Sequence, residues 1–382
     1  MQHQQVSIGD RLYLNDGQGN FVRSPTSLPK MTGWHNCVRA ADYDQDGDID
    51  LFVGGRLEPG TYPKTPRSYL LENRDGKLVD NTPSSLQQIG MVTDAQWLQS
   101  SDSFPPDLVV VGEWMSPTII KNKQGQLNKA ESLSTAAPGW WTHLNILDLD
   151  QDGDQDFLLG NWGWNHKLKA SPKEPVRLYA ADFDENGTMD PLLSCFIQGQ
   201  DYIMHERDLL IAQIPGMKRR FPQYDKYAQA GLAQTLSKKD LGRASILESQ
   251  TMSSALLMNQ SDAKFELKEL SEEFQLSPIM GSVSLDINAD GLTDLITAGN
   301  FHATETTQIG CYDASYGQIA LQTENGEWQS STALQFGMNL DGDVRGLASL
   351  QLANGQIIIL APRYNGALAV YRYSPGPPVQ PL

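Results

Sequence analysis

Four short segments of the chain place oxygen-bearing side chains at every second position around a central glycine. They are residues 42–50, 148–156, 182–190 and 286–294, and all follow the pattern D-x-[DN]-x-[DN]-G-x-x-D. Hard oxygen donors at positions 1, 3, 5 and 9, a main-chain carbonyl at position 7 and a sharp turn at the glycine suit Ca²⁺. We therefore predict about four bound calcium ions. The predicted metal-binding positions are Asp42, Asp44, Asp46, Asp48, Asp50, Asp148, Asp150, Asp152, Asp154, Asp156, Asp182, Asp184, Asn186, Thr188, Asp190, Asp286, Asn288, Asp290, Leu292 and Asp294.

These loops differ from the helix–loop–helix calcium site, whose loop ends in a bidentate Glu at position 12. Position 12 is instead Val53, Leu159, Leu193 or Thr297. Position 9 is followed each time by a short apolar run that a small residue closes, which is typical of a strand. We expect each loop to connect two strands of a β-hairpin. A plain acidic turn is the alternative, and four copies in one register favour the metal.

The spacing of the loops predicts the fold. Loops and strands recur with a period of about 53 residues, which with four strands per unit is typical of a β-propeller. Residues 94–112 repeat the unit but keep only Asp107 of the acidic positions. A second phrase, a strand ending in an Asn/Gly turn, alternates with the loops and indicates hairpins. We expect one all-β domain over residues 1–382, a β-propeller of about six (possibly seven) four-stranded blades with a helical insertion.

Two parts of that propeller are less regular. The half-repeat at 11–22 is expected to complete the last blade, which begins at 345–373. The hairpin at 176–198 follows its predecessor too soon, so it fits either the outer half of the third blade or the inner half of a fourth. Residues 199–247 have a helical period, and we expect a helical insertion there.

The alternating D-x-D-x-D-G-x-x-D-L loops and L-x-N-x-G-x-G-x-F hairpins resemble the FG-GAP and VCBS repeats of calcium-binding, integrin-alpha-like propellers. Phrases such as Leu51-Phe-Val-Gly-Gly-Arg56, Val111-Gly-Glu-Trp114 and Tyr312-Asp-Ala-Ser-Tyr316 are most similar to bacterial surface proteins related to cartilage acidic protein. The resemblance covers residues 10–373. It implies the propeller and its calcium ions, but it says little about activity because fold does not give function.

Charge and composition restrict the partners. The formal net charge is −17, which disfavours nucleic acid. No apolar run is long enough for a transmembrane segment. Calcium loops of this kind fill where calcium is near millimolar, so we expect an extracellular, cell-surface or periplasmic protein. Residues 1–6 are not a secretion signal, and we expect that signal to be absent from this chain.

The insertion at 199–247 carries a local excess of basic residues on an acidic protein. We consider it a possible partner site, with packing on the blade edges or on the protein's own acidic surface as the alternatives. The basic residues are Lys218, Arg219, Arg220, Lys226, Lys238, Lys239 and Arg243.

No catalytic motif is present, and we predict a protein that is not an enzyme. The 6 histidines lack metal-ligand or nucleophile–base spacing, and no G-x-S-x-G segment exists. A Ser–His–Asp arrangement of distant residues stays open. Trp34 and Trp140, each eight residues before a loop, are expected in the core between blades, or else at the channel mouth. The three cysteines, Cys37, Cys195 and Cys311, are expected to be buried and unpaired.

These observations favour a calcium-stabilised binding or scaffold module for a protein or glycan ligand. The alternative is a calcium-dependent propeller hydrolase or lyase acting on polysaccharide or phosphoester.

Overall fold

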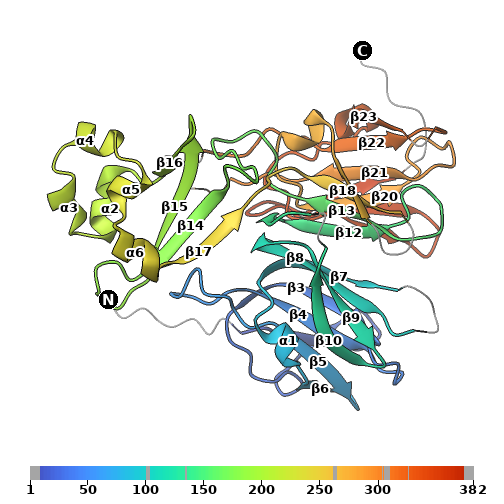
Figure 1. The fold of residues 1–382 in the computed structure, drawn as a ribbon. Coiled ribbons are helices and arrows are strands. Elements are labelled where there is room, and N and C mark those ends of the chain that lie inside the picture. Colours follow the sequence, from blue (N-terminus) through green and yellow to red (C-terminus); the bar gives the residue numbers. More distant parts are fainter. Residues whose placement is uncertain are drawn as a thin grey trace.

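The computed structural model describes residues 9–99, 104–133, 136–260, 265–302, 304, 310–325 and 327–373. This part of the chain is all-β, with antiparallel sheets, most of them of four strands, and a few short helices (Figure 1). The strands are short, several of them are buried along their whole length, and turns with a left-handed residue follow many of them. The prediction of an all-β chain is confirmed.

The first sheet shows the repeating unit. It contains β3 (Trp34–Ala41), β4 (Asp50–Leu57), β5 (Tyr69–Arg74) and β6 (Lys77–Asp80), paired in chain order. The first acidic loop connects β3 to β4, so the expected hairpin is confirmed. The strand after each of the other acidic loops also begins at position 9, at Asp156, Asp190 and Asp294.

Three further sheets follow the same plan. The second contains β7 (Met91–Leu98), β8 (Asp107–Met115), β9 (Thr118–Lys123) and β10 (Gln126–Ser132), with the short β11 (Gly139–Trp140) paired to β8. The third is β12 (His143–Leu147), β13 (Asp156–Gly160), β18 (Ala255–Asn259) and β19 (Phe265–Glu269). The fourth is β20 (Gly281–Leu285), β21 (Asp294–Ala298), β22 (Gln318–Gln322) and β23 (Trp328–Thr332).

The chain between β13 and β18 builds a separate sheet. Its strands are β14 (Val176–Ala181), β15 (Asp190–Ile197), β16 (Gln200–Ile203) and β17 (Ser245–Ser249), in the order β16-β15-β14-β17. The hairpin at 176–198 therefore belongs to neither the third nor a fourth regular unit. It was ambiguous in sequence because it carries the same acidic loop as the regular hairpins.

The expected helices lie between β16 and β17, on one side of this inserted sheet (Figure 1). All are shorter than eight residues. They are α2 (Arg207–Gln213), α3 (Met217–Arg220), α4 (Tyr224–Ala228), α5 (Leu232–Thr235) and α6 (Lys238–Arg243). Outside the insertion lie the short α1 (Ser84–Gln87) and the 3-10 turns η1 (Glu272–Gln275) and η2 (Ala333–Phe336).

Two smaller sheets lie at the ends of the described chain. At the C-terminal end, β24 (Ala348–Gln351), β25 (Ile357–Ala361) and β26 (Ala369–Arg372) form three strands. At the N-terminal end, β1 (Leu12–Asn15) pairs with β2 (Phe21–Ser24), and Leu12 packs on the buried face of the first sheet. Within the described residues no strand pairing joins these two sheets, so the completion of the last blade by residues 11–22 stays a prediction.

Apolar cores fill the space between consecutive sheets. Phe52 of the first sheet and Val110 of the second belong to one buried cluster, and Val109 of the second and Phe157 of the third belong to the next. Further clusters join the third sheet to the fourth and the fourth to β25. Each sheet thus packs face to face on the next one along the chain.

The first strands of these sheets surround a common cavity. Among them β3 contacts β7, β7 contacts β12, β12 contacts β20, and β20 contacts β24. A cavity of about 870 Å³ is lined by residues of β3, β7, β12 and β20 and of the segment before β24, among them Arg39, Asp94, His143, Gly281 and Leu347. Five sheets of the described chain therefore face the cavity, whereas the sequence predicted six or seven blades. The difference arises because the hairpin at 176–198 belongs to the inserted sheet and not to a blade.

Candidate metal centre

The four acidic loops share one backbone conformation. Position 4 has a φ of 62° at Gln45, 60° at Gln151, 62° at Glu185 and 65° at Ala289, and the glycine at position 6 has a φ between 88° and 97°. This left-handed region costs an L-residue about 1–2 kcal/mol and costs glycine little. The same uncommon pair of angles in all four loops shows that they form the same turn.

Aspartates shape each turn from inside. In the first loop the main-chain N–H groups of Asp46 and Gly47 donate to the two carboxylate oxygens of Asp42, at 3.1 and 3.0 Å. The N–H of Asp48 donates to Asp46 Oδ1 at 2.9 Å. The glycine-to-position-1 bond recurs at Asp148, Asp182 and Asp286. The loop is thus ordered by positions 1 and 5 through bonds to the backbone.

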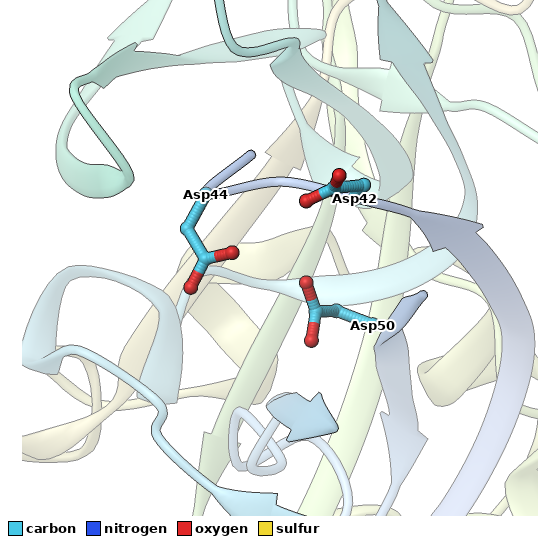
Figure 2. Close-up of side chains that lie close together, drawn as sticks. All are labelled: Asp42, Asp44 and Asp50. Atoms are coloured by element: carbon cyan, nitrogen blue, oxygen red, sulfur yellow. The ribbon is translucent and has the colours of Figure 1, made fainter. Parts of the chain in front are cut away.

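Three of the loops bring three carboxylates together. One oxygen each of Asp42, Asp44 and Asp50 lies within 4.8 Å of the others, and Figure 2 shows the three groups facing a common space. The matching groups are Asp148, Asp150 and Asp156, and Asp182, Asp184 and Asp190. Positions 1, 3 and 9 converge, as the pattern predicts. Like charges this close repel unless a cation or a proton lies between them.

Two of these groups contain oxygen atoms that lack a partner. Asp148 Oδ1 and Asp184 Oδ1 are buried, and neither accepts a hydrogen bond within the described residues. A buried carboxylate oxygen without a partner is costly. Because every donor atom at these positions is oxygen, the residues fit a hard divalent cation such as Ca²⁺.

Position 5 and the fourth loop lie outside these carboxylate groups. Asp46 and Asp152 at position 5 are not among the converging carboxylates, and Asn186 carries an amide there instead. The fourth loop has the amide of Asn288 at position 3, and this amide donates to Asp290 at 2.8 Å. Position 7, where Asp48, Asp154, Thr188 and Leu292 lie, was predicted to act through its carbonyl, and calcium binding at all of these positions stays a prediction.

Position 9 has a second role that the sequence pattern does not reveal. Asp50 is fully buried; one of its oxygens accepts the N–H of Tyr43 at 3.3 Å and the other accepts the N–H of Asn73 on β5 at 2.7 Å. Asp156 accepts in the same way from Leu149 and Asn259. Asp294 accepts from Ile287 and Gln322. The acid at position 9 therefore ties its own loop to the third strand of the same sheet.

The two alternating phrases of the sequence meet at this tie. Asn73 and Asn259 lie in the hairpin phrases, and their main-chain N–H groups donate to the acid at position 9 of the acidic loop. In the sequence, only the recurrence of both phrases at one period indicates that they contact each other. The hydrogen bond itself could not be predicted, because any residue except proline can donate its main-chain N–H.

The electrostatics of position 9 follow from its burial. Burial raises the pKa of the Asp50 carboxyl to about 6, the hydrogen bonds from Asn73 and Tyr43 oppose the rise, and Asp44 and Asp46 add to it. Burial likewise raises the pKa of Asp156, Asp190 and Asp294. In the absence of a cation these groups hold protons more tightly than an exposed carboxyl, so protons and cations compete for them.

The degenerate loop keeps this tie and pairs its acid with a lysine. Asp107, at position 9 of the second sheet, accepts the N–H of Asn122 at 2.7 Å, as Asp50 does from Asn73. Its other oxygen accepts from the Lys121 ammonium at 2.8 Å. The residues equivalent to Lys121 in the other sheets are Glu72, Met258 and Leu321. A side-chain cation therefore balances the one acid that the pattern positions of this loop retain.

The insertion supports the third loop. The Arg243 guanidinium on α6 donates to the carbonyl of Phe183 in that loop and pairs with Glu185 at 3.5 Å and with Asp240 at 3.2 Å. The Arg220 guanidinium donates to the Thr235 carbonyl inside the insertion. Two of the basic residues that were considered for a partner thus bind the protein itself.

Other sequence-predicted residues divide between core and surface. Trp140 is buried against Trp114 and Trp162, with ring centroids 5.0 and 5.3 Å apart, whereas Trp34 is 41% exposed and lines the central cavity. Trp140 thus lies in the core, the first of the two positions expected for these tryptophans, whereas Trp34 lies at the cavity, close to the second. Cys37 and Cys195 are buried as expected; Cys311 is exposed, because it precedes an isolated bridge outside any strand.

Comparison with known proteins identifies one repeat. Residues 7–53 match the family model described as FG-GAP-like repeat, and this stretch contains the first acidic loop. No curated protein matches the chain. In the part of the chain that the structure describes, no helix combines the length and the apolar character needed to cross a lipid bilayer.

Solved structures give only distant likenesses. The Vibrio cholerae biofilm matrix protein Bap1 has a TM-score of 0.34 at 9% identity, over 96% of this chain and 74% of its own. The BBS1N–ARL6DN complex soaked with lead has a TM-score of 0.32 at 9% identity, over 93% and 96%. The chain thus carries an FG-GAP-like repeat, whereas the resemblance to integrin-alpha and to cartilage acidic protein relatives stays a prediction.

Proposed function

We propose that this chain is a calcium-binding, propeller-like module that works outside the cell as a binding or scaffold unit for a protein or glycan. The carrying observation is the shared geometry of the acidic loops, three of which hold three carboxylate oxygens within 4.8 Å of one another. The FG-GAP-like match over residues 7–53 includes the first of them.

The role assigned to calcium is structural. The loop acids would hold the ion by positions 1, 3, 5 and 9 and the carbonyl of position 7, and the ion would supply the positive charge that clustered carboxylates lack. Position 9 connects the loop to the third strand, so an ion held there would couple the hairpin to the whole sheet. Millimolar calcium outside the cell matches the affinity range of such modules.

The propeller arrangement is supported by packing. Five consecutive sheets pack face to face and present their first strands to one cavity. The leading strands of a propeller line its central channel in this manner. Closure between the β24–β26 sheet and the first sheet, through residues 11–22, is part of the proposal.

The surface offers two candidate partner sites. Trp34 and Tyr364 are exposed aromatic residues beside the central cavity. Five basic residues of the insertion remain as exposed positive charges on an acidic protein: Lys218, Arg219, Lys226, Lys238 and Lys239. Aromatic surfaces with polar neighbours are typical of binding sites.

The test is thermal unfolding against calcium concentration, from excess chelator to about 10 mM, with magnesium in parallel. At a concentration 100 times the Kd, one site adds about 2.7 kcal/mol of stability. Asp44→Asn removes one negative charge but keeps an oxygen at position 3, so it should reduce the contribution of the first loop, and Asp75→Asn, an exposed acid in the β5–β6 turn, serves as the matched control. Equal melting of the wild type in calcium and in chelator would refute the structural role of the metal.

A further inference from the structure

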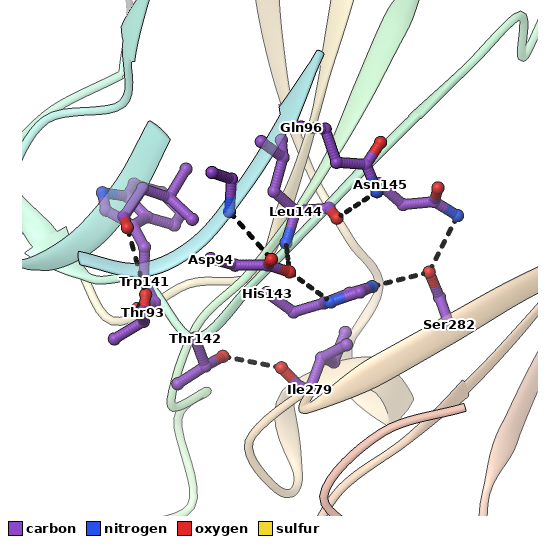
Figure 3. Close-up of polar contacts among 12 residues, drawn as sticks. Thr93, Asp94, Gln96, Trp141, Thr142, His143, Leu144, Asn145, Ile279 and Ser282 are labelled. Atoms are coloured by element: carbon purple, nitrogen blue, oxygen red, sulfur yellow. Dashed lines mark hydrogen bonds and ion pairs between the residues drawn. The ribbon is translucent and has the colours of Figure 1, made fainter. Parts of the chain in front are cut away.

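A chain of hydrogen bonds crosses the wall of the central cavity. Asp94 on β7, His143 on β12 and Ser282 on β20 come from the first strands of three consecutive sheets. His143 Nδ1 lies 3.0 Å from Asp94 Oδ2, and His143 Nε2 lies 2.9 Å from Ser282 Oγ (Figure 3). These are the contacts of an acid, a base and a nucleophile in a serine hydrolase.

The surroundings of Asp94 determine where the protons lie. Asp94 is buried and accepts from the main-chain N–H of Ala95 and of Leu144, at 2.8 and 3.0 Å, and from the Arg39 guanidinium. Burial alone would raise its pKa, but the bond from His143 and the charges of His143 and Arg39 outweigh burial and lower the pKa. The carboxylate is therefore charged and only accepts.

Because Asp94 only accepts, His143 Nδ1 must carry the proton of that bond. In a neutral imidazole Nε2 is then the acceptor, so the Ser282 hydroxyl donates to it. The Asn145 amide donates to Ser282 Oγ at 3.0 Å, which fills one of its acceptor positions and leaves its proton directed at His143. This tautomer is the one that a general base needs.

The cavity adjoins these three residues: Asp94 and His143 line it, and Ser282 directly follows Gly281 of the lining. His143, Asp94, Thr142 and Gly281, the neighbour of Ser282, line its wall, and its volume of about 870 Å³ is in the range of small-molecule sites. Ser282 keeps 7% of its surface exposed. Trp34 and Tyr364 provide apolar surface on the same cavity.

We propose that Ser282, His143 and Asp94 form a hydrolytic site for small carboxylic esters, with Ser282 as the nucleophile, His143 as the base and Asp94 as the positioning residue. Ser282 Oγ bonds to the ester carbonyl carbon while its proton passes to His143 Nε2. The proton then goes to the leaving alkoxide as the ester C–O bond breaks, which yields an alcohol and an acyl-serine. Water attacks the acyl carbon, its proton goes to His143 and then to Ser282 Oγ, and a carboxylic acid leaves.

Asn145 is the donor nearest to the reacting atoms. Its Nδ2, 3.0 Å from Ser282 Oγ, fixes the orientation of that hydroxyl toward His143.

The test uses the calcium-loaded full chain and two probes. A fluorophosphonate reagent followed by peptide mapping reports a reactive serine, and 4-nitrophenyl acetate reports hydrolysis. Wild type should be labelled at Ser282, and Ser282→Ala should lose the label and at least about 100-fold of the hydrolysis. Ser284→Ala, two residues further along β20, is the matched control and should keep both.

Asp94 needs a readout that packing alone would not change. Asp94→Asn should lower the rate and move the pH–rate profile toward lower pH, because the imidazolium loses the facing negative charge. Absence of label on folded wild-type protein, or equal hydrolysis by wild type and Ser282→Ala, would overturn the proposal. The three residues would then be only a polar link between sheets. Labelling of wild type does not depend on how any variant folds.

Discussion

At the scale of single residues, the acidic loop divides its work between positions. Asp44 at position 3 makes few bonds to the protein and shares space with Asp42 and Asp50. Asp50 at position 9 is buried and holds two main-chain N–H groups. Asp44 can therefore bind a cation, whereas Asp50 stabilises the fold even when no cation is bound.

Asparagine at these two positions should therefore have different effects. In Asp50→Asn the amide N–H₂ must face a main-chain N–H, which leaves a buried donor unsatisfied and should cost about 2 kcal/mol in chelator. Asp44→Asn should change stability in chelator by no more than about 0.5 kcal/mol. Asp50→Asn should lose the calcium increment of the first loop, whereas Asp44→Asn should only reduce it, because position 3 is Asn288 in the fourth loop. Urea unfolding with and without calcium measures this, and equal losses for both variants in chelator would contradict it.

The raised pKa of position 9 predicts a pH dependence. Asp50 has a pKa of about 6, above its ordinary value of 3.8, so its contribution to the metal-free protein is fully present below 3.8 and is lost as pH rises through 6. Asp156, Asp190 and Asp294 shift in the same direction.

We expect chelated protein to lose stability between pH 4 and about 7, and calcium to bind more weakly below pH 6 because protons compete for the carboxylates. Melting temperatures across this range, with calcium and with chelator, measure both effects. Asp50→Asn should show a smaller change in chelator than Asp75→Asn. Calcium affinity that does not vary between pH 5 and about 7 would argue against the competition.

At the scale of elements, the sequence predicts most of the hairpins. It does not predict which strands from distant parts of the chain pair with them. Loop 42–50 and the strand from Asp50 follow from local pattern and turn chemistry. The pairing of β13 with β18 does not, because Leu159 and Ala255 are separated by an inserted sheet with the same loop pattern. Asp94, His143 and Ser282 are also distant in sequence, so only the packing of sheets brings them together.

The second sheet allows a test of whether the Lys121 ammonium stabilises the buried Asp107 in place of a metal ion. Lys121→Met would leave Asp107 with its main-chain bond and no cation. The loss should be about 1 kcal/mol, since the ammonium is partly exposed, and should be the same with calcium and with chelator. Lys123→Met on the same strand is the control, and chemical unfolding gives the values. A calcium-dependent loss would mean that this loop also holds an ion.

At the scale of the whole molecule, one aromatic cluster joins the insertion to the body. Trp162 contacts Trp140 and Tyr312 at centroid distances of 5.3 and 5.0 Å, and the cluster extends to Met91 on β7 and to Leu178 on β14. The inserted sheet therefore shares a core with the other sheets, and we expect the protein to unfold in one transition.

Trp162→Ala should remove that coupling. The loss should be about 3–5 kcal/mol for a buried tryptophan, and the insertion should then melt separately. Circular dichroism and tryptophan fluorescence, recorded on the same samples, should coincide for the wild type and diverge for the variant. Trp164→Ala, at a residue 40% exposed, is the control. A single coincident transition in Trp162→Ala would show that other contacts suffice.

The two ends of the inserted segment lie side by side. The N–H of Asn161 donates to Ser254 Oγ at 2.9 Å, directly where β13 ends and β18 begins. The junction itself is fully buried, at Asn161 and at Ser254. An engineer who attached a foreign domain here would therefore have to rebuild this buried contact as well as match the short distance between the two ends.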